Sequence, residues 1–375
     1  MLWSPCEGLM KKKIALLLYR YFPYGGLQKD FLGISKELIS RGHELKVYTR
    51  SWEGDIPNNL DVIELGEKGF SNYSKNRNYV KNVKQHLKEF LPDIIFGFNK
   101  MPGLDLYFAA DTCFAKHSKI KNPLQKITRR YMQSMQFEKA VFSQYSNSKI
   151  LILNKNQYDD FNDFYSTQSE RLTIIPPGID RNWNNYKSIN IHDLHGISKE
   201  DKIILFVGSD FSRKGLDRCI LGINHLKKQK IPTTLLVLGD DSKAPYEKII
   251  KELELGKKIL FLGPRNDVSS FMKSSDLLIH PAREEAAGNI IIEALVSGLP
   301  CLVSSEVGFS DQVSKYNSGK IVEGKFNQEK FNLLLEESIS DKSLIAIKNS
   351  ISNLSDNDYF FSRSSFIADF IEETF

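Results

Sequence analysis

The chain repeats one local pattern, in which a short apolar run is followed by a turn and then by a longer amphipathic segment. This alternation is typical of a parallel β-sheet whose strands are joined by helices. In the first half, a helix is predicted over residues 27–40, and it ends near Gly42. Strands of this half are predicted at residues 13–19, 45–49, 94–98, 106–110, 149–153 and 172–175.

The pattern breaks at Pro176-Pro177-Gly178 and restarts after a polar, asparagine-rich stretch that runs to about residue 195. A second helix is predicted over residues 216–228, with strands at residues 203–207, 234–238, 258–262, 277–280 and 301–304. A chain of 375 residues also exceeds the ~250–300 residues that one hydrophobic core supports. We therefore predict two Rossmann-like α/β domains, with ligands in a cleft at the carboxyl ends of the strands. The predicted segments are residues 1–178, residues 179–357 and a final aromatic helix, 358–375.

Two glutamates stand eight residues apart in Glu285-Ala-Ala-Gly-Asn-Ile-Ile-Ile-Glu293. Gly288 permits a tight turn, and the free N–H groups of a helix that starts there attract phosphate. Glu293 could accept both hydroxyls of a ribose, and Glu285 could meet a transferred group. The arrangement resembles the donor-nucleotide motif of retaining glycosyltransferases with the two-domain GT-B fold. The alternative is a loop glutamate and a solvated helix glutamate, because glutamate is common.

A second motif, Gly208-Ser-Asp-Phe-Ser-Arg213-Lys214-Gly215, follows a predicted strand and opens a helix. Arg213 can contact two phosphate oxygens and Lys214 adds a point charge. The D-x-D sequence that often holds a metal occurs here only at residues 356–358, far from any predicted strand end. We therefore expect the two cations to replace a metal ion and expect no cofactor. The alternative is an ordinary exposed basic turn.

The remaining candidates follow other strands. Arg265 and Asp267 lie in a turn that could touch a nucleotide base, although Asp267 could instead cap the next helix. His280, at the end of a strand, is interpreted as structural. Gly25 and Gly26 let backbone N–H groups approach the phosphate of the transferred sugar.

Two aspartates of the first half are further candidates. Asp30 lies one turn into the first helix, facing the cleft or solvent, and Asp111 follows a strand. Asp111 is the preferred candidate for a polar contact to the sugar or the acceptor, and its alternative role is a helix or turn cap. The glycine pair is not G-x-G-x-x-G, and no acidic residue ends the second strand, which disfavours a dinucleotide oxidoreductase.

Residues 114–142 combine basic and aromatic side chains, which on a helix favours binding to an anionic lipid surface. Glu138 is the one acidic residue among them. The alternatives are nucleic-acid binding and a solvated basic face. The basic residues are Lys116, Lys119, Lys121, Lys126, Arg129, Arg130 and Lys139.

Composition adds weaker limits. The net charge of +5 is modest. The four cysteines are scattered singly without C-x-x-C, which supports neither a zinc site nor a disulfide framework and fits a reducing cytosol. No apolar run reaches the ~20 residues of a membrane span, so action at a membrane would be at its surface. Residues 1–10 are interpreted as an extension from an upstream start codon.

Taken together, these motifs resemble the lipopolysaccharide core glucosyltransferase I family from about residue 12 onward. The motifs that carry the resemblance are Tyr21-Phe-Pro-Tyr-Gly-Gly-Leu-Gln, Ser51-Trp-Glu-Gly-Asp, Gly97-Phe-Asn-Lys-Met-Pro-Gly-Leu-Asp, Pro176-Pro-Gly-Ile, Gly208-Ser-Asp-Phe-Ser-Arg-Lys-Gly, Arg265-Asn-Asp-Val and Glu285-Ala-Ala-Gly. The resemblance implies a GT-B fold whose last helix crosses back to the first domain. It also implies a cytoplasmic enzyme, peripheral to the inner membrane, that moves α-glucose from UDP-glucose to the first heptose of the lipid-linked core.

Carried over by motif, the resemblance implies that UDP-glucose is held by Gly25, Gly26, Arg181, Arg213, Lys214, Arg265, Glu285, Ala287, Gly288, Asn289 and Glu293. The local spacing at Arg181 departs from the family, and Asn289 stands where an apolar residue is expected. The candidate catalytic residues are Asp111, Asp30 and Glu285. The expected partners are a UDP-sugar, a lipid-linked oligosaccharide and the anionic membrane surface, without nucleic acid.

Other functions stay open at this point. A related transferase could use another UDP-sugar or another glycolipid acceptor. A nucleotide-sugar epimerase shares the two-domain architecture, and a lipid-binding scaffold without activity would need only residues 114–142.

Overall fold

The computed structural model describes residues 11–23, 25–118 and 122–375, which form two compact units. One unit comprises Met1–Gly178 and Ser362–Phe375, and the other comprises Ile179–Phe361. The chain leaves the first unit directly after the Pro-Pro-Gly break. The predicted final segment, however, begins too early at residue 358. Residues 358–361 belong to the second unit, where the ring of Phe360 lies 5.2 Å from that of Tyr316.

The first unit contains a parallel sheet in the order β3-β2-β1-β4-β5-β6-β7. The central strand β1 is an apolar run that is buried on both faces, as the interior of a parallel sheet requires. The order reverses between β1 and β4, so their carboxyl ends form a switch point. The strands are β1 (Lys13–Tyr21), β2 (Glu44–Trp52), β3 (Asp61–Glu64), β4 (Ile94–Gly97), β5 (Leu106–Ala109), β6 (Lys149–Ile152) and β7 (Leu172–Ile174).

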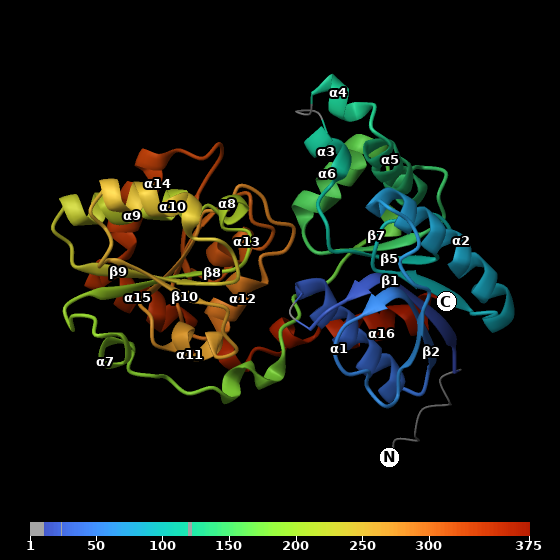
Figure 1. The fold of residues 1–375 in the computed structure, drawn as a ribbon. Coiled ribbons are helices and arrows are strands. Elements are labelled where there is room, and N and C mark those ends of the chain that lie inside the picture. Colours follow the sequence, from blue (N-terminus) through green and yellow to red (C-terminus); the bar gives the residue numbers. More distant parts are fainter. Residues whose placement is uncertain (1–10, 24, 119–121) are drawn as a thin grey trace, which may run out of the picture. The chain divides into compact units, whose positions relative to one another are not determined.

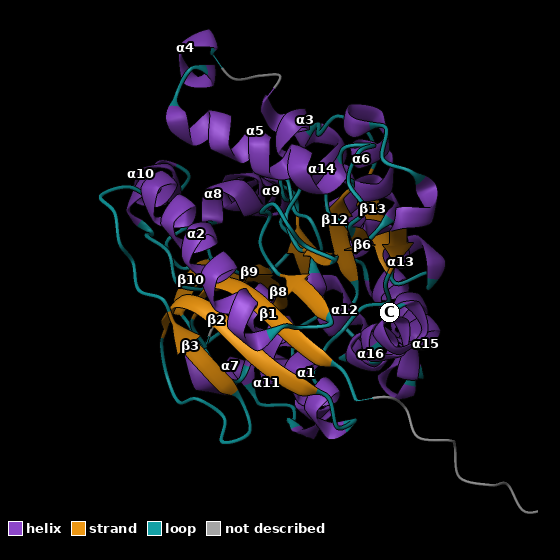
Figure 2. Cartoon of the chain, turned by 90° about the vertical axis from the view of Figure 1, so that its right-hand side faces the viewer, coloured by secondary structure: helices purple, strands orange, loops and turns teal. Residues whose placement is uncertain are grey.

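Helices flank this sheet, and α4 lies beyond α5 at the outer end of the unit in both views (Figure 1, Figure 2). The predicted helix at residues 27–40 is confirmed as α1, whereas α2 was not anticipated. The helices are α1 (Gly26–Ser40), α2 (Asn72–Phe90), α3 (Phe114–Ser118), α4 (Pro123–Lys126), α5 (Arg129–Phe142), α6 (Lys155–Tyr165), the short η1 (Ser169–Arg171) and α16 (Arg363–Thr374).

The second unit contains a parallel sheet in the order β10-β9-β8-β11-β12-β13. All five strands predicted in this half are present, and β13 is additional. The strands are β8 (Lys202–Val207), β9 (Thr233–Leu238), β10 (Ile259–Gly263), β11 (Leu277–His280), β12 (Cys301–Ser304) and β13 (Gly319–Val322).

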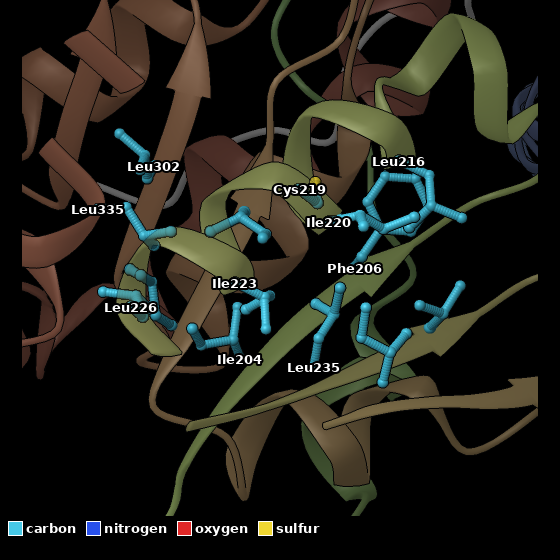
Figure 3. Packing of buried hydrophobic residues seen from close by; sticks show 14 of the residues in the cluster. Ile204, Phe206, Leu216, Cys219, Ile220, Ile223, Leu226, Leu235, Leu302 and Leu335 are labelled. Atoms are coloured by element: carbon cyan, nitrogen blue, oxygen red, sulfur yellow. The ribbon is translucent and has the colours of Figure 1, made fainter. Parts of the chain in front are cut away.

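The connecting helices of the second unit bury one apolar face against this sheet. Figure 3 shows the face of α9 that carries Leu216, Ile220 and Ile223 turned toward Ile204 and Phe206 of β8. The helical elements are η2 (Arg181–Asn185), α7 (Ile191–His195), α8 (Phe211–Lys214), α9 (Leu216–Lys228), α10 (Ala244–Glu252), α11 (Val268–Lys273), α12 (Asn289–Val296), α13 (Ser310–Lys315), α14 (Gln328–Ser338), α15 (Asp341–Ile351), η3 (Leu354–Asp356) and η4 (Asp358–Phe361).

A buried ion pair attaches the last helix to the first unit. Nη1 of Arg363, at the start of α16, lies 2.6 Å from Oδ1 of Asp30 in α1, and the two side chains are 1% and 12% exposed. Nε of Arg363 also donates to the carbonyl of Pro176 at 3.1 Å. The predicted position of Asp30, facing the cleft or solvent, is therefore wrong. Asp30 is a structural residue that anchors α16.

We expect Arg363→Met to lower the free energy of unfolding by roughly 3–5 kcal/mol, because it leaves the buried Asp30 carboxylate without its cation. The matched control is Arg181→Gln, which breaks an exposed pair with Asp358 whose side chains are 68% and 82% exposed. That change is expected to cost about 1 kcal/mol or less. Urea unfolding followed by circular dichroism measures both, and equal losses would contradict the structural role of Arg363.

Candidate donor site

The loop after β8 presents the two predicted cations on a backbone that only glycine allows. Gly208 has φ 140°, and a Cβ atom there would lie 2.5 Å from the Lys214 side chain. Gly215 has φ 82°, and a Cβ atom there would lie 2.2 Å from the carbonyl oxygen of Pro281. The loops that follow β8 and β11 can therefore touch, and N–H of Arg283 donates to the carbonyl of Arg213 at 2.7 Å.

From the loop after β8, the side chains of Arg213 and Lys214 both reach the loop that follows β11. Nε of Arg213 lies 2.9 Å from Oδ2 of Asp210, and its Nη1 donates to the carbonyl of Glu284 at 2.8 Å. Nζ of Lys214 lies 3.3 Å from Oε1 of Glu285. The structure thus places Glu285 beside Arg213 and Lys214, which lie 72 and 71 positions earlier in the sequence. It also adds a contact between cation and carboxylate that the motifs did not predict.

Glu285 is held on its other side by His280. Nε2 of His280 lies 2.6 Å from Oε2 of Glu285, and the His280 side chain is fully buried at the end of β11. Burial raises the pKa of Glu285, but the neighbouring imidazole and the two cations outweigh this effect and hold that pKa well below its usual range. Burial lowers the pKa of His280 despite the carboxylate beside it. Glu285 is therefore an ionised carboxylate at neutral pH, and His280 is neutral.

The predicted turn at Gly288 is present and starts α12. Gly288 has φ 78°, and a Cβ atom there would lie 2.2 Å from Cγ1 of Val307. The adjoining loop is hydrogen-bonded to this turn, since N–H of Phe309 donates to the carbonyl of Ala287 at 2.8 Å. Asn289 is the first residue of α12, and Glu293 lies one turn further along, half-buried. The first turn of α12 thus begins shortly after Glu285 in the chain, and its free N–H groups are of the kind that bind phosphate.

Arg265 lies beside a hollow of about 410 Å³ in the second unit, lined by Tyr186, Pro264, Arg265, Asn266 and Asp267. Its guanidinium contacts both carboxylate oxygens of Asp267, at 2.6 and 2.8 Å, and lies over the ring of Phe271. Asp267 occupies the cap position of α11 but makes no side-chain cap hydrogen bond. The hydrogen bond from Arg265 instead holds the pKa of Asp267 below its usual value. Asp267 therefore holds Arg265 and does not cap α11, and the contact of this turn with a nucleotide base stays a prediction.

Arg181 does not join these residues. Its Nη2 lies 2.8 Å from Oδ1 of Asp358, and its guanidinium lies over the ring of Phe361. Asp358 is one of the two aspartates of the D-x-D sequence, so that carboxylate is already paired. Over the described parts of the chain, no group of three or more His, Cys, Asp or Glu side chains is arranged to hold a metal ion.

The predicted residues of the first unit follow its strands. Gly25 and Gly26 lie at the start of α1, and a Cβ atom at Gly25 would lie 1.8 Å from Oε1 of Gln28. Asp111 is exposed in the loop after β5, and Nε2 of Gln157 donates to its carbonyl at 3.1 Å. The side chain of Asp111 thus lies at the carboxyl edge of this sheet, as predicted.

Glu138 is a residue that the sequence did not mark as functional. It lies in α5 with its side chain fully buried, and it contacts Nζ of Lys100 from the loop after β4. N–H of Phe114 and N–H of Ala115 donate to its two oxygens at 2.8 and 2.9 Å, and Tyr165 Oη donates at 2.7 Å. Glu138 therefore joins the loops after β4 and β5 to α5. The available signal was a lone acidic residue in a basic segment.

The basic segment, residues 114–142, contains α3, α4 and α5. Lys116 is paired with Asp160 at 2.9 Å, whereas Arg129 and Arg130 are exposed at the start of α5. Lys126 ends α4 and is partly exposed, and Lys119 and Lys121 lie outside the described residues. Large apolar side chains beside these cations are also exposed, namely Leu124 at 72%, Ile127 at 71% and Met132 at 53%. Within the residues that the structure covers, no helix is long and apolar enough to span a membrane.

Comparisons with known proteins cover both units. Residues 24–183 match the model "Glycosyltransferase Family 4", and residues 188–353 match "Glycosyl transferases group 1". The lipopolysaccharide glucosyltransferase WaaG of Escherichia coli K12 is 40% identical over 339 residues, which cover 88% of this chain and 90% of that protein.

Solved structures agree with this relationship. A crystal structure of WaaG, a glycosyltransferase involved in lipopolysaccharide biosynthesis, superposes with a TM-score of 0.87 at 37% identity, covering 96% of this chain and 99% of that one. Anabaena HepE in complex with UDP-glucose superposes with a TM-score of 0.72 at 19% identity, covering 97% and 99%, and this likeness concerns the fold alone. The chain therefore belongs to the retaining GT-B glycosyltransferase family that includes the lipopolysaccharide glucosyltransferase WaaG.

Proposed function

We propose that this protein transfers glucose from UDP-glucose, with retention of the α configuration, to the first heptose of a lipid-linked lipopolysaccharide inner core. The contact between Lys214 and Glu285 carries the proposal. It puts a phosphate-binding cation beside a sugar-binding carboxylate, which is the arrangement that a sugar linked to a diphosphate needs. The 40% identical relative is a lipopolysaccharide glucosyltransferase, which supports glucose and this acceptor class.

Each part of the donor has a proposed partner in the second unit. Arg213, Lys214 and the first turn of α12 bind the diphosphate, because guanidinium, ammonium and free helix N–H groups all favour phosphate. Glu293 accepts the ribose hydroxyls, and Arg265 with its adjoining hollow receives the base. Glu285 accepts glucose hydroxyls, which its low pKa favours because an ionised carboxylate is the stronger acceptor.

Retention is proposed to follow from attack on the face that the diphosphate leaves. The departing diphosphate itself takes the proton of the acceptor hydroxyl, so the protein supplies positioning and charge stabilisation rather than a strong base. The cations of the loop after β8 stabilise the charge that develops on UDP. A divalent metal is not required in this scheme. In the first unit, Asp111 orients the sugar or the acceptor, and the glycine pair Gly25 and Gly26 lets the backbone approach the donor.

Residues 114–142 are proposed to hold the protein on the anionic inner-membrane surface. Arg129 and Arg130 attract anionic headgroups, and exposed side chains such as Leu124 and Ile127 insert shallowly. This arrangement suits an acceptor that is itself anchored in the membrane. The second candidate function, favoured by the same family match, is transfer from another UDP-sugar or to another glycolipid.

The proposal is tested by UDP release from a panel of UDP-sugars, with truncated lipopolysaccharide as acceptor. We expect UDP-glucose with a heptose-terminated acceptor to give the highest kcat/KM, and we expect excess EDTA to leave that rate unchanged. A preference for another donor or acceptor would establish the second candidate. Activity lost to EDTA and restored by Mg²⁺ or Mn²⁺ would show that the two cations do not replace a metal. UDP-sugar turnover without acceptor would indicate an epimerase.

Replacing Glu293 and replacing Glu285 are expected to have different effects, one on UDP binding and the other on kcat. Glu293→Ala should weaken UDP binding by roughly 1.5–3 kcal/mol, because it removes a charged hydrogen bond to ribose. Glu285→Ala should lower kcat with little change in UDP affinity, because its contact is with the sugar and tightens in the transition state. Calorimetry with UDP and steady-state kinetics separate these effects. If both variants weaken UDP binding equally, the assigned roles are wrong.

The membrane contact is tested by replacing Lys126, Arg129 and Arg130 together with Gln. Each cation near an anionic surface contributes about 1 kcal/mol, so the variant should leave anionic vesicles at physiological salt. UDP-glucose affinity should be unchanged, because none of the three replaced residues is a proposed donor contact and the residues proposed to bind UDP lie in the other unit. The control replaces three exposed lysines of the second unit, Lys228, Lys251 and Lys257.

Two outcomes would contradict this prediction. Binding that is equal on neutral and anionic vesicles, and insensitive to salt, would exclude the electrostatic contribution. Salt-sensitive RNA binding at the same three residues, without vesicle binding, would favour a nucleic-acid interface.

A further inference from the structure

His280 is a buried residue that the proposed chemistry leaves without a role. Its ring packs near that of Phe206 and is held at the end of β11, where His280 pairs with Val303 of β12. It is fully buried, so the ring cannot reach a bound ligand directly. Its one hydrogen-bond partner in the described residues is the carboxylate of Glu285, through Nε2, and its Nδ1 has no hydrogen-bond partner there.

The missing partner at Nδ1 identifies the form of the ring. A buried N–H without an acceptor carries a large desolvation penalty, so Nδ1 is the unprotonated nitrogen. Nε2 then carries the proton and donates it to Oε2 of Glu285 in a short, charge-assisted bond. Burial lowers the pKa of His280, and the nearby cations Lys214 and Arg213 lower it further despite the Glu285 carboxylate, which agrees with a neutral ring.

The rest of Glu285 is fixed by backbone contacts. Its N–H donates to the carbonyl of Glu306 at 3.1 Å, and its own carbonyl accepts from N–H of Gly308 at 3.0 Å. With Oε2 taken by His280, the remaining oxygen, Oε1, faces Lys214 at 3.3 Å. Rotation of the carboxylate is therefore limited at one oxygen by a rigid ring and at the other by a flexible lysine.

We propose that His280 is a positioning residue, which orients the Glu285 carboxylate toward the transferred sugar by donating from Nε2. The inference rests on the proposed function, in which Glu285 contacts glucose. When a donor is bound, Lys214 serves the diphosphate, and its long side chain can turn away from Glu285. The contact from His280 involves no donor atom and stays in place, so the carboxylate keeps its orientation through the reaction.

Two substitutions of His280 by an amide side chain distinguish a role in positioning Glu285 from a role in packing alone. The amide of His280→Gln reaches the position of Nε2 and can donate to Glu285, whereas the amide of His280→Asn reaches only the position of Nδ1. Both place one amide in the same buried space, so packing and desolvation are closely matched. We expect His280→Asn to lower kcat by about 10- to 100-fold, because misplacement of a positioning group by about 1 Å has effects of this size.

The Gln variant should retain kcat within a few-fold of the wild type. Both variants should bind UDP with unchanged Kd, because UDP lacks the transferred glucose. Equal kcat values for the two variants would overturn the proposal. A loss of kcat in His280→Asn that is matched by an equal loss of UDP affinity would also overturn it, because it would indicate a general distortion of the site.

A measurement on the ligand-free protein tests the geometry without any variant of His280. Nitrogen-15 histidine spectra at pH 7 should show His280 with a protonated Nε2 and an unprotonated Nδ1, and the Nε2 resonance should shift in Glu285→Gln. The opposite tautomer, a charged ring or an unchanged resonance would overturn the proposal. If the wild-type protein does not use UDP-glucose, the proposed function is wrong. The spectra still test the contact between His280 and Glu285, because they need no donor.

Discussion

The candidate donor site depends on the order of the parallel strands in the second unit. Strands β8, β11 and β12 are neighbours in that sheet, so the loops that follow them emerge side by side at one edge. Gly215 and Gly288 then let the loops approach to a distance that any side chain would block. Arg213, Lys214 and Glu285 meet because of this close backbone packing.

Much of both sheets could be predicted because buried parallel strands are nearly continuous apolar runs. The elements that were missed lack this signal. Strand β3 is four residues with a charged residue at each end, and β13 contains a glycine and a lysine in four residues. Both lie at the edge of their sheets, where one side needs no strand partner. Helix α2 is strongly polar and buries only three residues, Tyr79, Val83 and Phe90.

Sequence motifs identified candidate-site residues that follow neighbouring strands. They did not identify contacts between segments that lie far apart in the chain. Asp30 looked available for chemistry, because its partner Arg363 lies 333 residues later. Arg181 likewise found its partner in Asp358, far along the chain. Glu138 contacts Lys100, 38 positions earlier in the chain, through a tertiary contact that the local sequence does not show. Each unit thus contains a largely buried carboxylate that contacts a lysine from another loop, Glu285 with Lys214 in one and Glu138 with Lys100 in the other.

The return of the chain to the first unit affects how this protein can be divided. The second unit is one continuous stretch, Ile179–Phe361, which a single gene fragment can encode. The first unit is not, because α16 contributes the buried residues Arg363, Ile367, Ala368 and Ile371. A fragment that stops at Gly178 would expose the face of α1 that α16 covers and leave Asp30 without its cation. Isolating the first unit therefore requires α16 to be rejoined through a linker, or supplied as a separate peptide.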